Sequence, residues 1–317
     1  MKPQQIFLSV LAGSSLMLSC AKNDTVSTPV NVDTYSSIDD VFSKLNLQPK
    51  TVTIDASTGG SFYGNSGTRY TFPASAFITT SGTTVTGSVQ VKVCEYLKKG
   101  DMLFSKMLPI SNGDPLLSGG EIDVSATQNG TPVYLKPHTF FSSNIPQGTA
   151  APTGMQFFAG NPTLDTTQFK TNWVQPALDS AHYNFVFTVS TDTLGIISDS
   201  LRRCNADMFM SSPNYQAFTV TAAVGGVTIN TSDKVFGYTL YDNYKSAWPL
   251  GYIGSYSAGV FSETHIPNIP VHFALFTFLG GKFYGGTLGV TPTTGSNYTV
   301  NLVETDPVVF KTQLNGL

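Results

Sequence analysis

A strict alternation of side-chain type is the feature that most constrains the fold of this chain. Every second residue from Val85 to Val93 is small or β-branched, and the residues between them are polar. A period of two is typical of a β-strand that has one face on an apolar core and the other face in water. The segment is therefore predicted to be a strand of an antiparallel β-sandwich.

Turn signals recur about every ten residues around this strand, a spacing typical of sandwiches. Asn112 and Asn129 each precede a glycine, and such pairs favour tight turns with positive φ. Charged residues make up only 12% of the 317 residues, and the length suits two domains. We expect an all-β protein with two antiparallel β-sandwich domains, a loosely structured connector and one short N-terminal helix. The expected parts are the helix plus first sandwich at 37–146, the connector at 147–202 and the second sandwich at 203–317.

Several short motifs flank the alternating strand in a fixed order. Gly59-Gly60 and Tyr70-Thr-Phe-Pro73 precede it, and Leu116-Leu-Ser-Gly-Gly120 follows it. This order resembles the β-sandwich domain shared by ankyrins, netrin receptors and tight-junction scaffolds. The chain is also similar to surface lipoproteins of Bacteroidota that carry such a domain, and that likeness extends through residues 203–209 and 265–270. The resemblance implies an interaction module.

One property of that family is not expected here. Some of its members cut themselves at a His-Phe-Ser site. This chain has His138-Thr-Phe-Phe-Ser142 instead, so the spacing departs from that pattern. We interpret His138 as part of an ordinary strand region.

The N-terminus has the features of a lipoprotein signal peptide. Lys2 gives a basic start, and Ile6–Leu18 is an apolar stretch too short to span a membrane as a mature helix. Cys20 follows Leu-Ser, so we expect a signal peptide at 1–19, acylation of the Cys20 thiol and a polar tether at 20–36. The lipid would anchor the chain in the cell envelope as a surface-exposed outer-membrane lipoprotein. The alternative is a plain secretory signal in which Cys20 is incidental.

The segment after the tether carries helix signals. Ser37 is an N-cap residue type, and Asp39 and Asp40 would lie in the first turn. We predict one short amphipathic helix that packs on the first sandwich, and a partner-binding helix is the alternative. The apolar positions at helical spacing are Ile38, Val41, Phe42 and Leu45.

Two cysteines remain if Cys20 carries lipid. Cys94 and Cys204 lie in different predicted domains, and the cell envelope permits disulfides. Cys94 shares a strand face with Lys92, so its thiol is expected to point away from the core. Either the two residues form an inter-domain disulfide, which needs Cα atoms within about 7 Å, or they are separate thiols.

Charge and motif patterns exclude several functions. The formal net charge of −3 argues against nucleic-acid binding, which needs a basic face. Prolines interrupt the stretch between His265 and His272, and no metal-ligand spacing or Gly-x-Ser-x-Gly elbow is present. Glu121 and Asp123 alternate on one strand and are interpreted as a solvated face. We expect no enzymatic activity, no cofactor and no metal.

The stretch Tyr238–Tyr252 mixes aromatic and polar side chains in a region expected to be a loop. Aromatic faces beside amide and carboxylate groups suit sugar rings or protein hot spots. The alternative is that some of these rings pack in the core. The candidate binding residues are Tyr241, Asp242, Tyr244, Trp248 and Tyr252.

Five Asp-Ser/Thr triplets resemble an O-glycosylation signal used in Bacteroidota. One lies in the tether and four lie in the connector. The resemblance implies sugar attachment in these two segments. The acceptor positions would be Thr25, Thr166, Ser180, Thr193 and Ser200.

These features favour a non-enzymatic, lipid-anchored module that binds an unknown protein or glycan. One alternative is a glycan-capture lipoprotein, which would need Tyr241, Tyr244 and Trp248 on an exposed platform. The other is a subunit of a surface fibre, which would need an exchangeable terminal strand such as Val308–Thr312.

Overall fold

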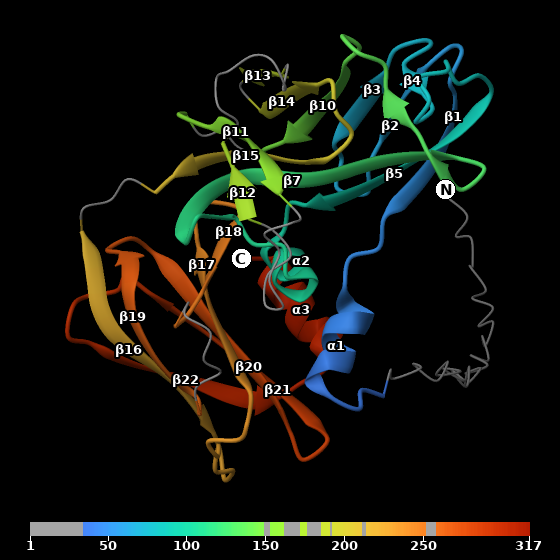
Figure 1. Cartoon of the computed structure of the whole chain (residues 1–317). Helices are drawn as coiled ribbons and strands as arrows, with labels where there is room; N and C mark the ends of the chain where they lie inside the picture. The colour runs from blue at the N-terminus through green and yellow to red at the C-terminus, as the bar shows by residue number, and fades with distance from the viewer. Residues whose placement is uncertain are drawn as a thin grey trace, which may run out of the picture. The chain divides into compact units, whose positions relative to one another are not determined.

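The computed structural model describes residues 34–148, 153–161, 172–175, 185–190, 192–210, 214–251 and 258–317 (Figure 1). Tyr35–Leu317 form one unit, which is the part described below. The predicted all-β class is confirmed, because strands make up 54% of the described residues and helices 10%. None of the described helices is long and apolar enough to cross a membrane.

Two sheets face each other in the first part of the unit. Apolar side chains from both sheets fill the space between them, including Val91 and Ile122 from one sheet and Phe72, Phe141 and Ile196 from the other. Within the described ranges, the first sheet has the order β1 (Lys50–Asp55), β5 (Ser88–Tyr96), β7 (Asp114–Gln128), β15 (Arg203–Phe209), β11 (Gln156–Asn161), β12 (Asn172–Val174), and β6 (Ile110–Ser111) and β8 (Thr131–Pro132) also pair with β7. The second sheet has the order β13 (Phe185–Val189), β14 (Thr193–Ser198), β10 (Phe141–Pro146), β3 (Arg69–Phe72), β2 (Gly60–Tyr63), and a small pair joins β4 (Phe77–Ile78) to β9 (Tyr134–Leu135).

The alternating segment behaves as predicted. In β5, Val89, Val91 and Val93 are buried between the two sheets, whereas Gln90 and Lys92 are exposed. The strand itself begins at Ser88, after Gly87 takes a φ of +75°. β5 pairs with β1 on one side and β7 on the other, both antiparallel. The period-2 pattern therefore identified an inner strand of a sandwich.

The expected connector contributes strands to both sheets. β14 pairs with β10 along its whole length, and β11 pairs with β15. β15 itself lies between β7 and β11, so the expected boundary at residue 203 falls at the start of an inner strand of the first sandwich. The structure places the change from the first sandwich to the last sheet between Phe209 and Tyr215. The short apolar islands at 147–202 carry no local signal for their distant partners, which is why the sequence indicated a loose connector.

The C-terminal part is one curled sheet with helices on it, in place of the second pair of sheets that was expected. The two edge strands of this sheet, which contain Trp248 and His265, approach each other. The rings of Trp248 and His265 are 6.4 Å apart, and the Gly251 N–H donates to the Glu263 carboxylate across 3.4 Å. β16 and β22 pair in parallel, and the other pairings are antiparallel. The order is β18 (Ser246–Pro249), β17 (Val235–Tyr241), β20 (Val271–Leu279), β21 (Lys282–Val290), β22 (Asn297–Glu304), β16 (Tyr215–Val224), β19 (Val260–Pro267).

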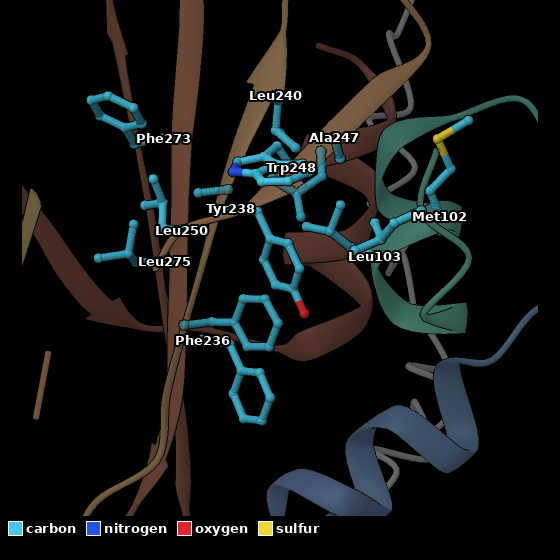
Figure 2. Packing of buried hydrophobic residues seen from close by; sticks show 14 of the residues in the cluster. Met102, Leu103, Phe236, Tyr238, Leu240, Ala247, Trp248, Leu250, Phe273 and Leu275 are labelled. Carbon is cyan, nitrogen blue, oxygen red and sulfur yellow. The ribbon is translucent and has the colours of Figure 1, made fainter. Parts of the chain in front are cut away.

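Three helices cover this sheet: α1 (Ile38–Leu45), α2 (Lys99–Ser105) and α3 (Pro307–Asn315) (Figure 1). Phe276 of β20 contacts a ring from each of them, with centroid distances of 5.9 Å to Phe42, 5.3 Å to Phe104 and 5.9 Å to Phe310. Met102 and Leu103 of α2 lie beside Ala247 in the same core (Figure 2). The helices therefore form the layer that a second sheet was expected to supply.

Helix α1 confirms the predicted cap and buried face. The Ser37 side chain accepts a hydrogen bond from the Asp40 N–H, and all four predicted apolar residues are buried. The helix packs both on α2, where the Phe42 and Phe104 rings are 5.9 Å apart, and on the aromatic core of the last sheet, where the Phe42 and Phe236 rings are 5.0 Å apart. The spacing of apolar residues identifies a buried face but not the surface that covers it.

The fibre hypothesis relied on Val308–Thr312 as a strand, and this expectation was wrong. These residues belong to α3, where the Asp306 carboxylate accepts from the Val308 and Val309 N–H groups. Phe310 is buried against the rings of Phe276 and Phe283. Asp before Pro is a helix-start signal, which outweighs the β propensity of the two valines.

Candidate functional site

A cavity of about 340 Å³ opens where distant segments of the chain meet. Its walls come from residues 97–99 before and at the start of α2, from Ser118 of β7, from Gln147 after β10, from residues 242–245 between β17 and β18, and from Asn315 and Leu317 at the end of α3. We call it the lysine cavity because Lys98, Lys99 and Lys245 line it. Its size lies at the lower end of the range for small-molecule sites.

Lys99 is the most buried of the three lysines. Only 5% of the residue is exposed, and its Nζ donates to the backbone oxygens of Leu317 at 3.0 Å and Asp242 at 3.5 Å. Burial lowers the pKa of Lys99 to about 8, because a charged ammonium loses solvation away from water. The Asp242 carboxylate acts in the opposite direction. Lys99 thus connects the start of α2 to two walls of the cavity.

Lys245 lies on the opposite chain segment with a similar environment. Its Nζ donates to the backbone oxygens of Pro146 at 2.7 Å and Gly119 at 3.1 Å. The backbone N–H of Lys245 donates to the backbone oxygen of Ser118 at 3.1 Å. Burial lowers the pKa of Lys245 to about 8 as well. These bonds hold the loop between β17 and β18 against the first sandwich.

The cavity carries more positive than negative charge. Asp242 is the carboxylate residue of the lining, and its Oδ1 lies 2.7 Å from Nδ1 of His272. Lys98 is exposed at the cavity wall. The side chains that line the cavity thus include three lysines and one carboxylate that already has a close partner, so they favour an anion.

The structure divides the five candidate binding residues. Asp242 and Tyr244 line the cavity, and Tyr252 lies outside the described residues. Tyr241 and Trp248 are completely buried in the core, with Trp248 beside Leu240 and Ala247 (Figure 2). Residues 238–241 and 246–249, which were expected to belong to a loop, lie in β17 and β18, and every residue of these two strands is buried. Core packing is therefore the correct interpretation for Tyr241 and Trp248, and no exposed platform contains them.

Cys94 and Cys204 are separate thiols. They lie on β5 and β15, which flank β7, where their partners are Asp123 and Ile122. Two strand spacings amount to about 10 Å, beyond the reach of a disulfide. The side chains also point to opposite faces, since Cys204 packs between the two sandwich sheets and Cys94 packs on the core of the last sheet. Burial raises the pKa of Cys204 to about 12, so this thiol stays protonated near neutral pH.

The interpretation of Glu121 as part of a solvated face was wrong. Glu121 and Asp207, on the neighbouring strands β7 and β15, are both completely buried. Burial raises the pKa of each carboxyl well above its usual range, and Asp207 raises the pKa of Glu121 further. Asn205 donates to Asp207, and neither Glu121 carboxylate oxygen has a hydrogen-bond partner among the described residues. Asp123 does lie nearer the surface, where it pairs with Arg203.

The sequence pattern could not reveal this buried pair. Alternation places Glu121 on the face of β7 opposite to Ile122, which is the outer face of the sandwich. That face is covered by the loop and strand at 244–246, where Ser246 donates to the Leu116 oxygen. A distant segment therefore covers part of the outer face of β7, whereas Ser125 farther along that face stays exposed.

The remaining candidate positions lie apart from the cavity. Thr193 and Ser200 are half-buried, and each takes part in local hydrogen bonds with Ser190 or Ser198. Oε1 of Glu263 lies 3.3 Å from Nδ1 of His265, whereas His272 contacts Asp242. No group of three or more His, Cys, Asp or Glu residues suited to a metal occurs in the described ranges. Cys20, Thr25, Thr166 and Ser180 lie outside the described residues.

Comparison with known proteins adds no identity to this description. No protein-family model matches the chain, and no curated protein sequence matches it.

Proposed function

We propose that this chain is a non-enzymatic, lipid-anchored binding module of the cell envelope, and that the lysine cavity is its ligand site. One observation carries the binding part: residues from five separate segments converge on a polar cavity of about 340 Å³. Proteins commonly place ligand sites where separate structural layers meet. Asp242 and Tyr244, which the sequence suggested as binding residues, belong to its lining.

The lipid anchor is supported by the sequence alone. Lys2, the short apolar stretch and Cys20 after Leu-Ser have the arrangement of a lipoprotein signal. The resemblance to surface lipoproteins of Bacteroidota favours the outer membrane. A surface-exposed module would meet soluble ligands directly.

Membrane attachment is tested by labelling cells with radioactive palmitate. Wild-type protein should carry label and sediment with membranes, whereas Cys20→Ser should carry none and appear in the soluble fraction. Cys94→Ser is the control and should behave as wild type. Label on Cys20→Ser, or none on wild type, would reject the lipid anchor.

Binding is tested by thermal shift of the purified full-length chain against a library of small polar compounds. The matched variant is Asn243→Trp, because Asn243 is exposed in the cavity lining and a large ring there would obstruct the cavity. Compounds that use the cavity should raise the melting temperature of wild type but not of Asn243→Trp. A library in which no compound separates the two proteins would contradict the assignment of the cavity as a ligand site.

A further inference from the structure

We infer that the lysine cavity binds a small hydroxylated organic anion, in which a carboxylate or phosphate group meets the lysines and the hydroxyl groups meet the polar walls. This inference rests on the proposed ligand site and adds the chemical class of the ligand. It is carried by the charge of the lining, by the unused hydrogen-bonding capacity of the lysines and by the polar side chains beside them.

The charge of the lining side chains favours a negative partner. Lys98, Lys99 and Lys245 contribute three ammonium groups, and the Asp242 carboxylate is held by His272 at 2.7 Å. An ammonium group that has lost solvation is stabilised by a nearby negative charge. An anion in the cavity would offset the lost solvation of the ammonium groups and would raise the pKa values of Lys99 and Lys245 from about 8.

Lys99, which is buried, and Lys245, which is half-buried, have N–H donors to spare. An ammonium group has three N–H donors. Lys99 uses two of them on the Leu317 and Asp242 oxygens, and Lys245 uses two on the Gly119 and Pro146 oxygens. One donor of each lysine therefore remains for a ligand. These backbone bonds also hold both ammonium groups in place before a ligand arrives.

The walls beside the lysines are suited to hydroxyl groups. Gln147 donates its amide N–H to the Gly119 oxygen at 2.9 Å, which leaves its carbonyl oxygen as an acceptor. Asn315 accepts the Asp101 N–H on its carbonyl oxygen at 3.0 Å, which leaves its amide N–H groups as donors. Both amides are therefore oriented by the fold. The volume of about 340 Å³ suits a molecule of the size of one sugar unit.

The inference is tested by calorimetric titration of the full-length chain at low salt with four probes: D-glucuronate, glucose 6-phosphate, glucose and inorganic phosphate. Glucuronate or glucose 6-phosphate, or both, should bind at least about 10-fold more tightly than glucose and than inorganic phosphate. Binding of glucuronate alone identifies a carboxylate ligand, and binding of glucose 6-phosphate alone identifies a phosphate ester. The inference would be overturned if glucose bound as tightly as the charged sugars, or if inorganic phosphate were the one probe that bound.

Three substitutions assign the effect to the cavity. Lys245→Met should weaken binding of the preferred probe by about 10-fold or more. Lys98→Met should weaken it several-fold without a change in melting temperature, because Lys98 is exposed. Lys92→Met, an exposed lysine on β5 outside the cavity, should bind as wild type. If Lys92→Met loses as much affinity as Lys98→Met, the charge effect is nonspecific and the inference fails.

The outcomes separate this inference from the proposed function. If neutral compounds from the library stabilise wild type but not Asn243→Trp, and neither charged probe binds, the cavity is a ligand site and only the anionic class is rejected. If a charged probe binds equally to wild type and Asn243→Trp, that probe uses another site and the inference is rejected for the cavity. If no library compound and no probe binds, both the assignment of the cavity as a ligand site and the anionic class of its ligand are rejected.

Discussion

The Nζ atom of Lys99 lies 3.0 Å from the backbone oxygen of Leu317, across a sequence separation of 218 residues. With Lys245 on the facing loop, this contact places two largely buried ammonium groups at the junction between the first sandwich and the last sheet. Both lysines are thus structural connections as well as candidate ligand contacts, and their titration links the stability of the junction to pH.

The first prediction concerns that titration. The pKa of Lys245 is about 8 in the folded chain and near its ordinary 10.5 when unfolded. Between these values the unfolded chain binds more protons, so this group makes the free energy of unfolding rise with pH. Urea unfolding at about pH 7 and about pH 10 should show wild type gaining stability relative to Lys245→Met.

Lys92→Met is the control for this measurement, because Lys92 is an exposed lysine of β5. Its stability difference from wild type should be the same at both pH values. If the stability difference between Lys245→Met and wild type were also the same at both pH values, the pKa of Lys245 would not be lowered in the folded chain.

The second prediction concerns Glu121, whose pKa is raised by burial and by Asp207. The folded chain keeps the Glu121 proton at pH values where the unfolded chain has lost it. The free energy of unfolding should therefore fall as pH rises above about 4.5, the ordinary pKa of the carboxyl. Glu121→Gln removes this dependence and should be more stable than wild type by about 1–3 kcal/mol at about pH 8.

A matched control for Glu121→Gln is Glu304→Gln, which changes a half-exposed carboxylate paired with Lys282 at 2.7 Å. Such surface pairs contribute less than about 1 kcal/mol, so this variant should follow wild type at all pH values. A constant difference in the free energy of unfolding between Glu121→Gln and wild type from about pH 5 to about pH 8 would contradict a raised pKa of Glu121.

The third prediction concerns the contact between Gly64 and Glu95. The Glu95 carboxylate is nearly buried and accepts from the Ser66 and Thr68 N–H groups at 2.7 and 2.9 Å. A Cβ atom on Gly64 would lie 2.1 Å from Glu95 Oε2, and the carboxylate cannot move away without losing both bonds. Gly64→Ala should lower the free energy of unfolding by about 1–3 kcal/mol, measured by urea unfolding.

Gly225→Ala provides the comparison, because nothing lies within 4 Å of a Cβ there and its φ is not in the left-handed region. It should change the free energy of unfolding by less than about 0.5 kcal/mol. Equal effects of the two substitutions would mean that the Glu95 side chain accommodates the added methyl group.

The fourth prediction concerns α3. Phe310 is buried between Phe276 and Phe283, and Gly285 lets its ring approach the backbone of β21. Phe310→Ala should lower the free energy of unfolding by about 3–5 kcal/mol. Val309, its neighbour in α3, is 61% exposed, so Val309→Ala should have an effect below about 0.5 kcal/mol. A small effect of Phe310→Ala in the same urea titration would show that α3 does not depend on this ring.

Features that depend on near neighbours in the chain were predictable. The alternation at Val85–Val93 identified the buried and exposed faces of β5, because side chains two residues apart share a face whatever the partner strand. Ser37 and the apolar spacing after it identified α1 for the same reason, since a cap and a helical face involve residues three or four apart.

What covers each face depended on the tertiary structure. Glu121 was expected in water and Tyr241 on a loop, yet distant segments bury both, and the hydration of a side chain is decided by all atoms that surround it. The sequence allowed a Cys94–Cys204 disulfide, but the order β5-β7-β15 separates the two thiols.

The lysine cavity is the clearest case. By itself, the sequence determined the all-β class, the first strand faces and the cap of α1, because these follow from local periodicity and backbone preference. Only the folded chain brings Lys99, Lys245 and Leu317 together and lowers the pKa of both lysines. Solvation and charge at that site are properties of three-dimensional proximity, which no local pattern contains.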